Sequence, residues 1–303
     1  TGSAVNDSMT IGAEGSTYSS GAGDDAFSTT MALIAADGAT DLVINAGAGT
    51  DTLTMSNTTG LSMTDINFTN INGMEKLTLA NTGAADTSIT TGAAFNAAFA
   101  DGATITSGIM AADQDMAVAA GLSTVDMTIT VAATSQTGAA TETNSFVTGS
   151  GADTVTYTDV GFVGVAGAAA GTITVDTRAG DDTISITVGI IVSDTTAVIS
   201  ITGGAGQDSI TKVGVNANDA QGVVTFVMAA GDSATTAYDS ITGYDMATAT
   251  TFADALEFEG TSAVSTFSAT VDSGTIKSHD INTGIVTFDD AAVWATAIVI
   301  NAA

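Results

Sequence analysis

The sequence contains no proline and no cysteine in its 303 residues. Proline donates no backbone N–H, so its absence suits a long hydrogen-bonded β-ladder that needs every donor. Without cysteine no disulfide can staple the fold, and a bound metal is one alternative staple. Both absences favour an extended β-structure that is not held together covalently.

Basic residues are almost missing as well. Four of them (Lys76, Arg178, Lys212 and Lys277) face 33 acidic residues, which gives a net charge of −29. Nucleic acid is excluded as a partner, because binding to phosphate requires Lys and Arg, and an anionic membrane surface is disfavoured. Self-repulsion of this size destabilises a compact fold, so the carboxylates must be solvated or neutralised by bound cations.

Aromatic residues make up only 5% of the chain, and no apolar run reaches the length of about 18 residues that a membrane-spanning helix needs. We therefore predict no direct membrane insertion. The chain is still 45% hydrophobic, which is more apolar than a disordered acidic chain. Its abundant Thr, Val and Ile favour strands, and the scarcity of aromatics indicates a thin core.

The best-defined segment is residues 197–212, AVISITGGAGQDSITK. Alternating apolar residues flank a turn that contains Gly203, Gly204 and Gly206. Glycine adopts positive φ easily and lets other backbone groups approach closely. Asp208 adds a carboxylate just after the turn, and carbonyl and carboxylate oxygens are the ligands that Ca²⁺ prefers. The segment predicts a strand, a Ca²⁺-binding turn and a second strand.

Four further copies of the turn occur at residues 21–27, 47–53, 149–155 and 178–184. Asp25 and Asp51 lie 26 residues apart, as do Asp182 and Asp208, and Asp153 precedes Asp182 by 29. The 102 residues between Asp51 and Asp153 correspond to about four steps of this size. A fixed period in this range indicates a solenoid. We predict an all-β parallel β-solenoid with a coil of roughly 26 residues and Ca²⁺ sites stacked along one edge.

The turn matches the G-G-x-G-x-D-x-U-x nonapeptide of RTX proteins. The chain therefore resembles an RTX-type (repeats-in-toxin) Ca²⁺-binding secreted bacterial surface protein. The segment Ile71–Leu79, INGMEKLTL, is similar to one found in S-layer proteins of that type. The resemblance implies that Ca²⁺ lies between successive coils, held by carbonyls near the glycines and by Asp carboxylates. The implied ligands are Gly21, Gly23, Asp25, Gly47, Gly49, Asp51, Gly149, Gly151, Asp153, Gly180, Asp182, Gly203, Gly204, Gly206 and Asp208.

Other interpretations of these residues stay open. Gly and Asp also form tight turns without metal, because Asp hydrogen-bonds nearby backbone groups. Asp7, in a variant motif at the N-terminus, is an additional candidate ligand. Arg178 stands where the motif has glycine, and its charge opposes a bound cation. Glu75 and Lys76 are expected to form an outward-facing pair, which contributes little at a surface.

We divide the chain into a Ca²⁺-binding β-solenoid at residues 1–245 and a terminal β region, a continuation or cap, at residues 246–303. Residues 85–124 are rich in alanine, and Phe95 and Phe99 lie at helical spacing. This part is predicted to be an insertion or a short helix. Because the pattern is cut at both ends, we also expect the chain to belong to a longer protein.

No motif for catalysis is found. The single histidine is His279, and neither the G-x-S-x-G nor the H-E-x-x-H pattern occurs. Paired carboxylates can cleave sugars, but the aromatic and basic residues that usually accompany them are scarce. We expect that the protein is not an enzyme.

The resemblance implies a secreted, structural protein of the bacterial cell surface. It would be stabilised by Ca²⁺ and would assemble with its own copies, as a homo-oligomer, into an S-layer or a filament. Low Ca²⁺ inside the cell would keep it unfolded for type I secretion, and external Ca²⁺ would fold it. The alternative is the repeat region of an RTX adhesin that binds another surface or a glycan. A cell-surface polysaccharide, bound through regions outside this chain, is a further expected partner.

Overall fold

The structure is a computed structural model. It describes residues 2–12, 15–34, 42–57, 60–81, 86–107, 114–133, 143–162, 171–190, 198–214, 223–228, 232, 239–243, 254–258, 266–268, 276–280, 285–288 and 298–301.

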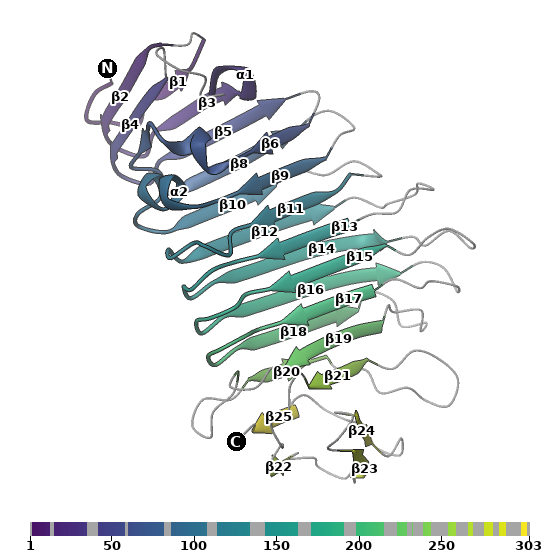
Figure 1. The fold of residues 1–303 in the computed structure, drawn as a ribbon. Helices are drawn as coiled ribbons and strands as arrows, with labels where there is room; N and C mark the ends of the chain where they lie inside the picture. Colours follow the sequence, from purple (N-terminus) through teal and green to yellow (C-terminus); the bar gives the residue numbers. More distant parts are fainter. Residues whose placement is uncertain are drawn as a thin grey trace.

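Two long β-sheets dominate the described part (Figure 1). Sheet A contains, in order, β1 (Ser8–Thr10), β3 (Ala26–Thr30), β5 (Thr52–Asn57), β8 (Lys76–Asn81), β10 (Ala103–Ser107), β12 (Met127–Ala133), β14 (Thr154–Phe162), β16 (Thr183–Ile190), β18 (Ser209–Gly214), β20 (Ser240–Thr242), β25 (Ile298–Asn301) and β22 (Thr266–Ser268). Sheet C contains β21 (Ala255–Phe258), β19 (Val223–Met228), β17 (Val198–Thr202), β15 (Thr172–Asp176), β13 (Thr143–Val147), β11 (Met116–Ala119), β9 (Thr87–Thr90) and β6 (Leu61–Met63). A smaller sheet B holds β2 (Thr17–Ala22), β4 (Val43–Ala48) and β7 (Ile71–Asn72), and β23 (Ile276–Asp280) pairs with β24 (Ile285–Phe288).

Successive strands alternate between the sheets, and each pairs in parallel with the strand one coil away. From β3 to β20, paired residues on neighbouring strands of sheet A lie between 24 and 31 residues apart in sequence, and 26 recurs, whereas β1 and β3 pair at a separation of 18. The predicted all-β parallel β-solenoid with a coil near 26 residues is therefore confirmed. From β9 onward, each sheet C strand leads into the next sheet A strand. The glycine turns after β13, β15 and β17 make this crossing, whereas those after β2 and β4 lead from sheet B into sheet A, and together they line one edge of the stack (Figure 1).

The pattern changes near the C-terminus. β25 pairs antiparallel with β20 and with β22, and β23 and β24 form an antiparallel pair. His279 lies in β23, whereas Trp294 falls outside the described residues.

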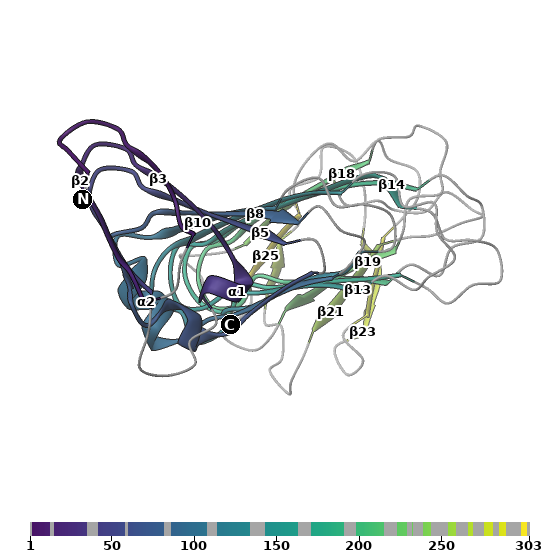
Figure 2. The same cartoon turned by 90° about the horizontal axis from the view of Figure 1, so that it is seen from above.

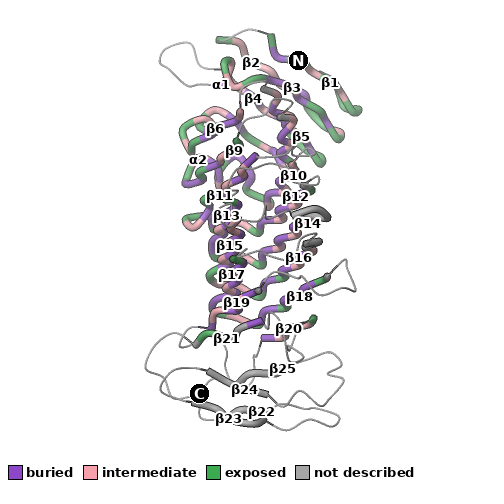
Figure 3. The backbone as a smooth tube through the Cα atoms, turned by 90° about the vertical axis from the view of Figure 1, so that its right-hand side faces the viewer, coloured by how far each residue is buried: buried purple, intermediate pink, exposed green. Residues whose placement is uncertain are grey.

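The core is a thin layer between the sheets, formed by the inward residue of each alternating pair (Figure 3). One fully buried column in sheet A contains Leu53, Leu77, Ile105, Ile129 and Val155 in register. Each such side chain contributes about 1.5–3 kcal/mol when it leaves water. The stack of β-branched and leucine side chains explains why so few aromatics are needed.

Of the alanine-rich residues 85–124, only α2 (Ala93–Ala98) is the short helix that was one of the two predicted outcomes. The same stretch also contains β9, β10 and β11, so it continues the coils of the solenoid and is not an insertion. The Asp65 carboxylate, from the 3₁₀ helix η1 (Asp65–Phe68), accepts the backbone N–H groups of Ala94 and Phe95 at 3.1 and 2.9 Å. Phe68 packs edge-on against Phe95, with ring centroids 5.0 Å apart. A second short helix, α1 (Met31–Ile34), follows β3. The bulge formed by η1 and α2 replaces glycine turns at this level of the stack.

Candidate metal site along the turn edge

The glycine turns stack directly on one another. Gly206 has φ = 151°, and a Cβ there would collide with the Gly180 carbonyl oxygen of the preceding coil. Gly149 has no positive φ, but a Cβ there would collide with the Ser123 carbonyl oxygen. The glycines are therefore required by the close approach of neighbouring coils, which brings carbonyl oxygens of one coil against the next.

A column of carboxylates runs along the inner side of this edge, and we call it the acid ladder. At each step a backbone N–H donates to the carboxylate of the following coil. The ladder has two blocks, Asp7, Asp25, Asp51 and Glu75, then Asp153, Asp182, Asp208 and Asp239. The donor–acceptor distances are 2.7, 2.8 and 2.7 Å in the first block and 2.7, 2.9 and 2.9 Å in the second.

These hydrogen bonds use only one oxygen of each carboxylate. The second oxygen, Oδ2, is buried and makes no hydrogen bond of good geometry in Asp25, Asp51, Asp153, Asp182 and Asp208. The Thr148 hydroxyl and Gly149 N–H lie near Asp153, and the Thr177 hydroxyl lies near Asp182. All five residues are at most 2% exposed. An ionised group buried without a partner is costly, so these oxygens require either a proton or a cation.

Five carboxylates of the acid ladder have a raised pKa. The pKa of Asp208 is raised to about 7, chiefly by burial, with the Asp182 N–H opposing the rise and the nearby Asp239, Asp182 and Asp232 charges adding to it. Burial likewise raises the pKa of Asp182 to about 6. The pKa values of Asp51, Glu75 and Asp153 are raised too, again chiefly by burial. Without a bound cation, the native state therefore keeps these carboxylates protonated at pH values where the unfolded chain has already released the same protons.

The two blocks are separated by two coils that carry no acid in the same column. Ala103 and Met127 occupy the positions one residue before Thr104 and Thr128, where the other coils place Asp or Glu. Both are buried. The bulge of η1 and α2 lies at this level. Because a site between coils needs an acidic residue on each side, the break divides the edge into two independent sets of candidate sites.

A second row of carboxylates lies on the outside of the turns. Asp24, Asp126 and Asp181 are exposed, and each accepts one backbone N–H from the following coil at 2.9 Å. This outer row is solvated, so its members serve as matched controls for the buried ladder.

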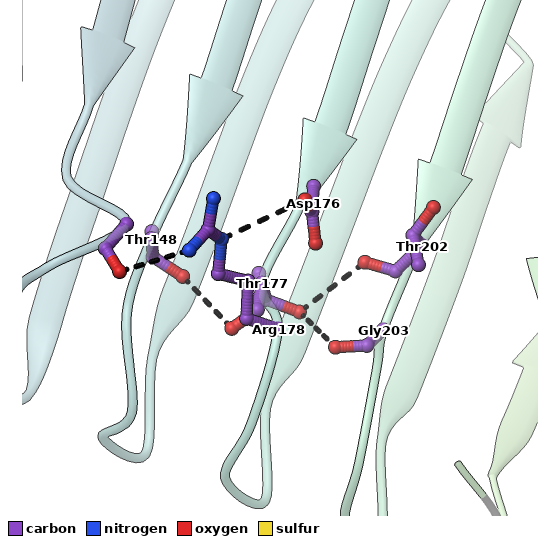
Figure 4. Close-up of polar contacts among 7 residues, drawn as sticks. Thr148, Asp176, Thr177, Arg178, Thr202 and Gly203 are labelled. Carbon is purple, nitrogen blue, oxygen red and sulfur yellow. Dashed lines mark hydrogen bonds and ion pairs between the residues drawn. The ribbon is translucent and has the colours of Figure 1, made fainter. Parts of the chain in front are cut away.

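Arg178 adopts φ = 64° in the place of a glycine. Its guanidinium donates to the Gly121 carbonyl at 3.0 Å and lies 3.8 Å from the Asp176 carboxylate (Figure 4). Beside it, the Thr177 hydroxyl donates to the Gly203 carbonyl at 2.8 Å, and Thr148 donates to the Thr177 carbonyl at 3.2 Å. Arg178 thus ties its turn to the coils before it.

The structure brings the predicted residues together in two sets: the turns of Asp25 and Asp51, and the turns of Asp153, Asp182 and Asp208. Asp239 joins the second set, although no complete glycine motif precedes it. The prediction that Glu75 faces outward is wrong, because Glu75 accepts the Asp51 N–H and completes the first block. Its spacing of 24 residues from Asp51 is the signal that identifies it.

One further charged pair lies inside the solenoid. The Lys212 Nζ is 2.8 Å from both carboxylate oxygens of Asp254, and both side chains are buried. The Val224 N–H also donates to Asp254 at 3.0 Å. Lys212 pairs in register with the core residue Ile186, which shows that a basic side chain occupies a core column.

A cation on this edge would be held by backbone carbonyls together with single carboxylates from adjacent coils. Among the described residues, no cluster of three or more His, Cys, Asp or Glu side chains forms a conventional metal site. The buried Oδ2 atoms fit a hard cation, and oxygen-only ligands fit Ca²⁺ better than Zn²⁺.

No protein-family model, curated protein or solved structure matches the chain. Within the described part, no helix is long and apolar enough to cross a membrane.

Proposed function

We propose that the protein is a secreted structural component of a bacterial cell surface, a solenoid whose coils are locked by Ca²⁺. The observation that carries the proposal is the row of five buried Oδ2 atoms that make no hydrogen bond of good geometry. Ca²⁺ between coils would supply their missing partner and would neutralise part of the −29 charge.

The proposal links export to folding. A cation that binds only the folded chain stabilises it by mass action, by about 2.7 kcal/mol per site at a concentration 100 times the Kd. In low Ca²⁺ the unneutralised carboxylates of the ladder oppose folding. In high Ca²⁺ the same carboxylates would bind the ion, and this binding would favour the folded state. The protein would then assemble with its own copies as an S-layer or a filament, the role that the RTX resemblance suggests.

The test is a Ca²⁺ titration of EGTA-treated protein, followed by circular dichroism and light scattering together. We expect the β-signal and the particle size to rise with Ca²⁺. A rise in β-signal without growth in size would favour the adhesin module, which binds a foreign surface as a monomer. No change in either signal would contradict both candidates.

Asp182→Asn and Asp181→Asn form a matched pair for this titration. Both replace a carboxylate in the same turn, but Asp182 is buried in the ladder and Asp181 is exposed. The midpoint of the Ca²⁺ response is expected to move to higher Ca²⁺ for Asp182→Asn only. Equal shifts in both variants would mean that the effect is one of net charge.

A further inference from the structure

The outward side of sheet A carries a regular array of hydroxyl groups. One column of it is unbroken over nine consecutive coils, each residue in register with the next. Its members are Ser28, Thr54, Thr78, Thr106, Thr130, Thr156, Ser185, Thr211 and Thr242. All nine are half-buried, with one side open to solvent.

A second column lies two residues earlier on the same strands. Its members are Ala26, Thr52, Lys76, Thr104, Thr128, Thr154, Thr183, Ser209 and Ser240. We call the two columns together the hydroxyl face. Only Ala26 and Lys76 interrupt it, so the part from β10 to β20 carries Thr or Ser at every position of both columns.

The face has fixed repeats in two directions. Coils are about 4.8 Å apart across the sheet, and residues two apart along a strand are about 6.6 Å apart. The strands of sheet A from β8 to β18 lie nearly over one another when viewed along the stack (Figure 2). Nine coils span about 38 Å at this spacing. The face is therefore long, flat and periodic, which a randomly decorated sheet surface is not.

The charge distribution indicates the kind of partner. The chain has 33 acidic residues, yet the hydroxyl face has none. The outward side of sheet C is mixed: one of its columns contains Val147, Asp176, Thr202, Val227 and Glu257, whereas the column two residues earlier carries Ser145, Thr174, Ser200 and Thr225. A carboxylate would hold its own hydration shell and disturb an ordered neutral surface. The hydroxyl face is matched to a partner without charge, while the remaining acids keep the molecule soluble.

We infer that the hydroxyl face binds the surface of ice. Ice presents an uncharged surface of water oxygens in regular rows, which is the kind of surface that a periodic and uncharged array of hydroxyl groups can match. Threonine offers a hydroxyl that can replace a lattice water and a methyl group that can sit between rows. Thr106, Thr130 and Thr156 lie at the centre of the unbroken column and are half-buried, so the outer side of each is open to solvent.

A second copy of the chain is a poorer match for this surface. Interfaces between copies have apolar centres with aromatic or arginine anchors, and no position of the hydroxyl face supplies either. The inference depends on the solenoid alone, so it does not require the proposed surface assembly.

The test uses the full chain in excess Ca²⁺, with thermal hysteresis and ice-crystal shape observed in a nanolitre osmometer. Thr156→Tyr places a bulky ring in the centre of the unbroken column, between Thr130 and Ser185. Thr174→Tyr is its matched control on the outward side of sheet C, also half-buried and flanked by Ser145 and Ser200. Circular dichroism checks that each variant is folded, and Thr106→Tyr replaces Thr156→Tyr if the latter is not.

We expect the unmodified protein to shape ice crystals and to show thermal hysteresis. Thr156→Tyr should lower the hysteresis several-fold, and Thr174→Tyr should leave it unchanged. The inference is overturned if the unmodified protein neither shapes ice nor shows hysteresis, or if both variants lose the effect equally. It is also overturned if Thr156→Tyr only dissociates oligomers in light scattering, since the face would then join copies of the chain.

Discussion

Asp208→Asn should stabilise the metal-free protein at pH 8. The native pKa of Asp208 is about 7 against an ordinary value of 3.8. One pKa unit corresponds to about 1.4 kcal/mol, so holding this carboxylate ionised in the fold costs about 4 kcal/mol. Asparagine removes the charge and keeps an oxygen that can accept the Asp182 N–H. Its buried amide group loses about 1–3 kcal/mol if it stays unpaired, which leaves a net gain of about 1–3 kcal/mol.

The direction of the pKa shift determines how the effect of Asp208→Asn on stability depends on pH. Because the native pKa is raised, the native state keeps its proton up to about pH 7 while the unfolded chain loses it near pH 4. The benefit of Asp208→Asn should therefore shrink as the pH falls from about 7 and disappear below about pH 4, where both states carry the proton.

The assay is urea unfolding in EGTA at pH 8 and pH 4.5, followed by circular dichroism, with Asp181→Asn as the exposed control. In excess Ca²⁺ at pH 8 the sign should reverse, since asparagine cannot neutralise the ion. A free-energy change for Asp208→Asn that is the same at both pH values in EGTA would refute the reasoning.

Three further predictions concern the stack as a whole. The metal-free protein should lose stability as the pH rises from about 4 to about 7, the window set by Asp182 and Asp208; melting curves in EGTA that are flat across this window would contradict it. Gly206→Ala should lower the unfolding free energy by more than about 1 kcal/mol, because its φ and the adjacent carbonyl exclude a Cβ; Gly12→Ala, where a Cβ meets nothing within 4 Å, is the control in the same urea assay. Lys212→Met should cost about 3–5 kcal/mol by removing the countercharge of the buried Asp254 carboxylate. Adding Asp254→Leu should recover most of this loss, and a double variant as unstable as the single would count against the explanation.

The sequence predicts the solenoid because two signals recur together at the spacing of one coil. These are the glycine turns and the alternating apolar segments that flank them. Asp25, Asp51, Asp153, Asp182 and Asp208 can be placed on one edge from their spacing alone, since equal spacing in a solenoid means the same position on each coil.

Other features are harder to predict. Glu75 lies 24 residues after Asp51, near the usual step of 26, but no complete glycine motif marks it, so spacing is the one signal that places it in the ladder. The ion pair of Lys212 and Asp254 joins residues 42 apart in sequence. The hydroxyl face can be recognised only when the register of the strands is known, because threonine is common in any β-structure.

Direct measurement of Ca²⁺ binding by isothermal titration calorimetry tests the central claim most directly. The unmodified protein should bind several Ca²⁺ ions, Asp181→Asn should bind the same number, and Asp182→Asn should lose the sites that its carboxylate shares with the coils of Asp153 and Asp208. An unmodified protein that binds no Ca²⁺, or an Asp182→Asn variant with unchanged stoichiometry and affinity, would contradict the account.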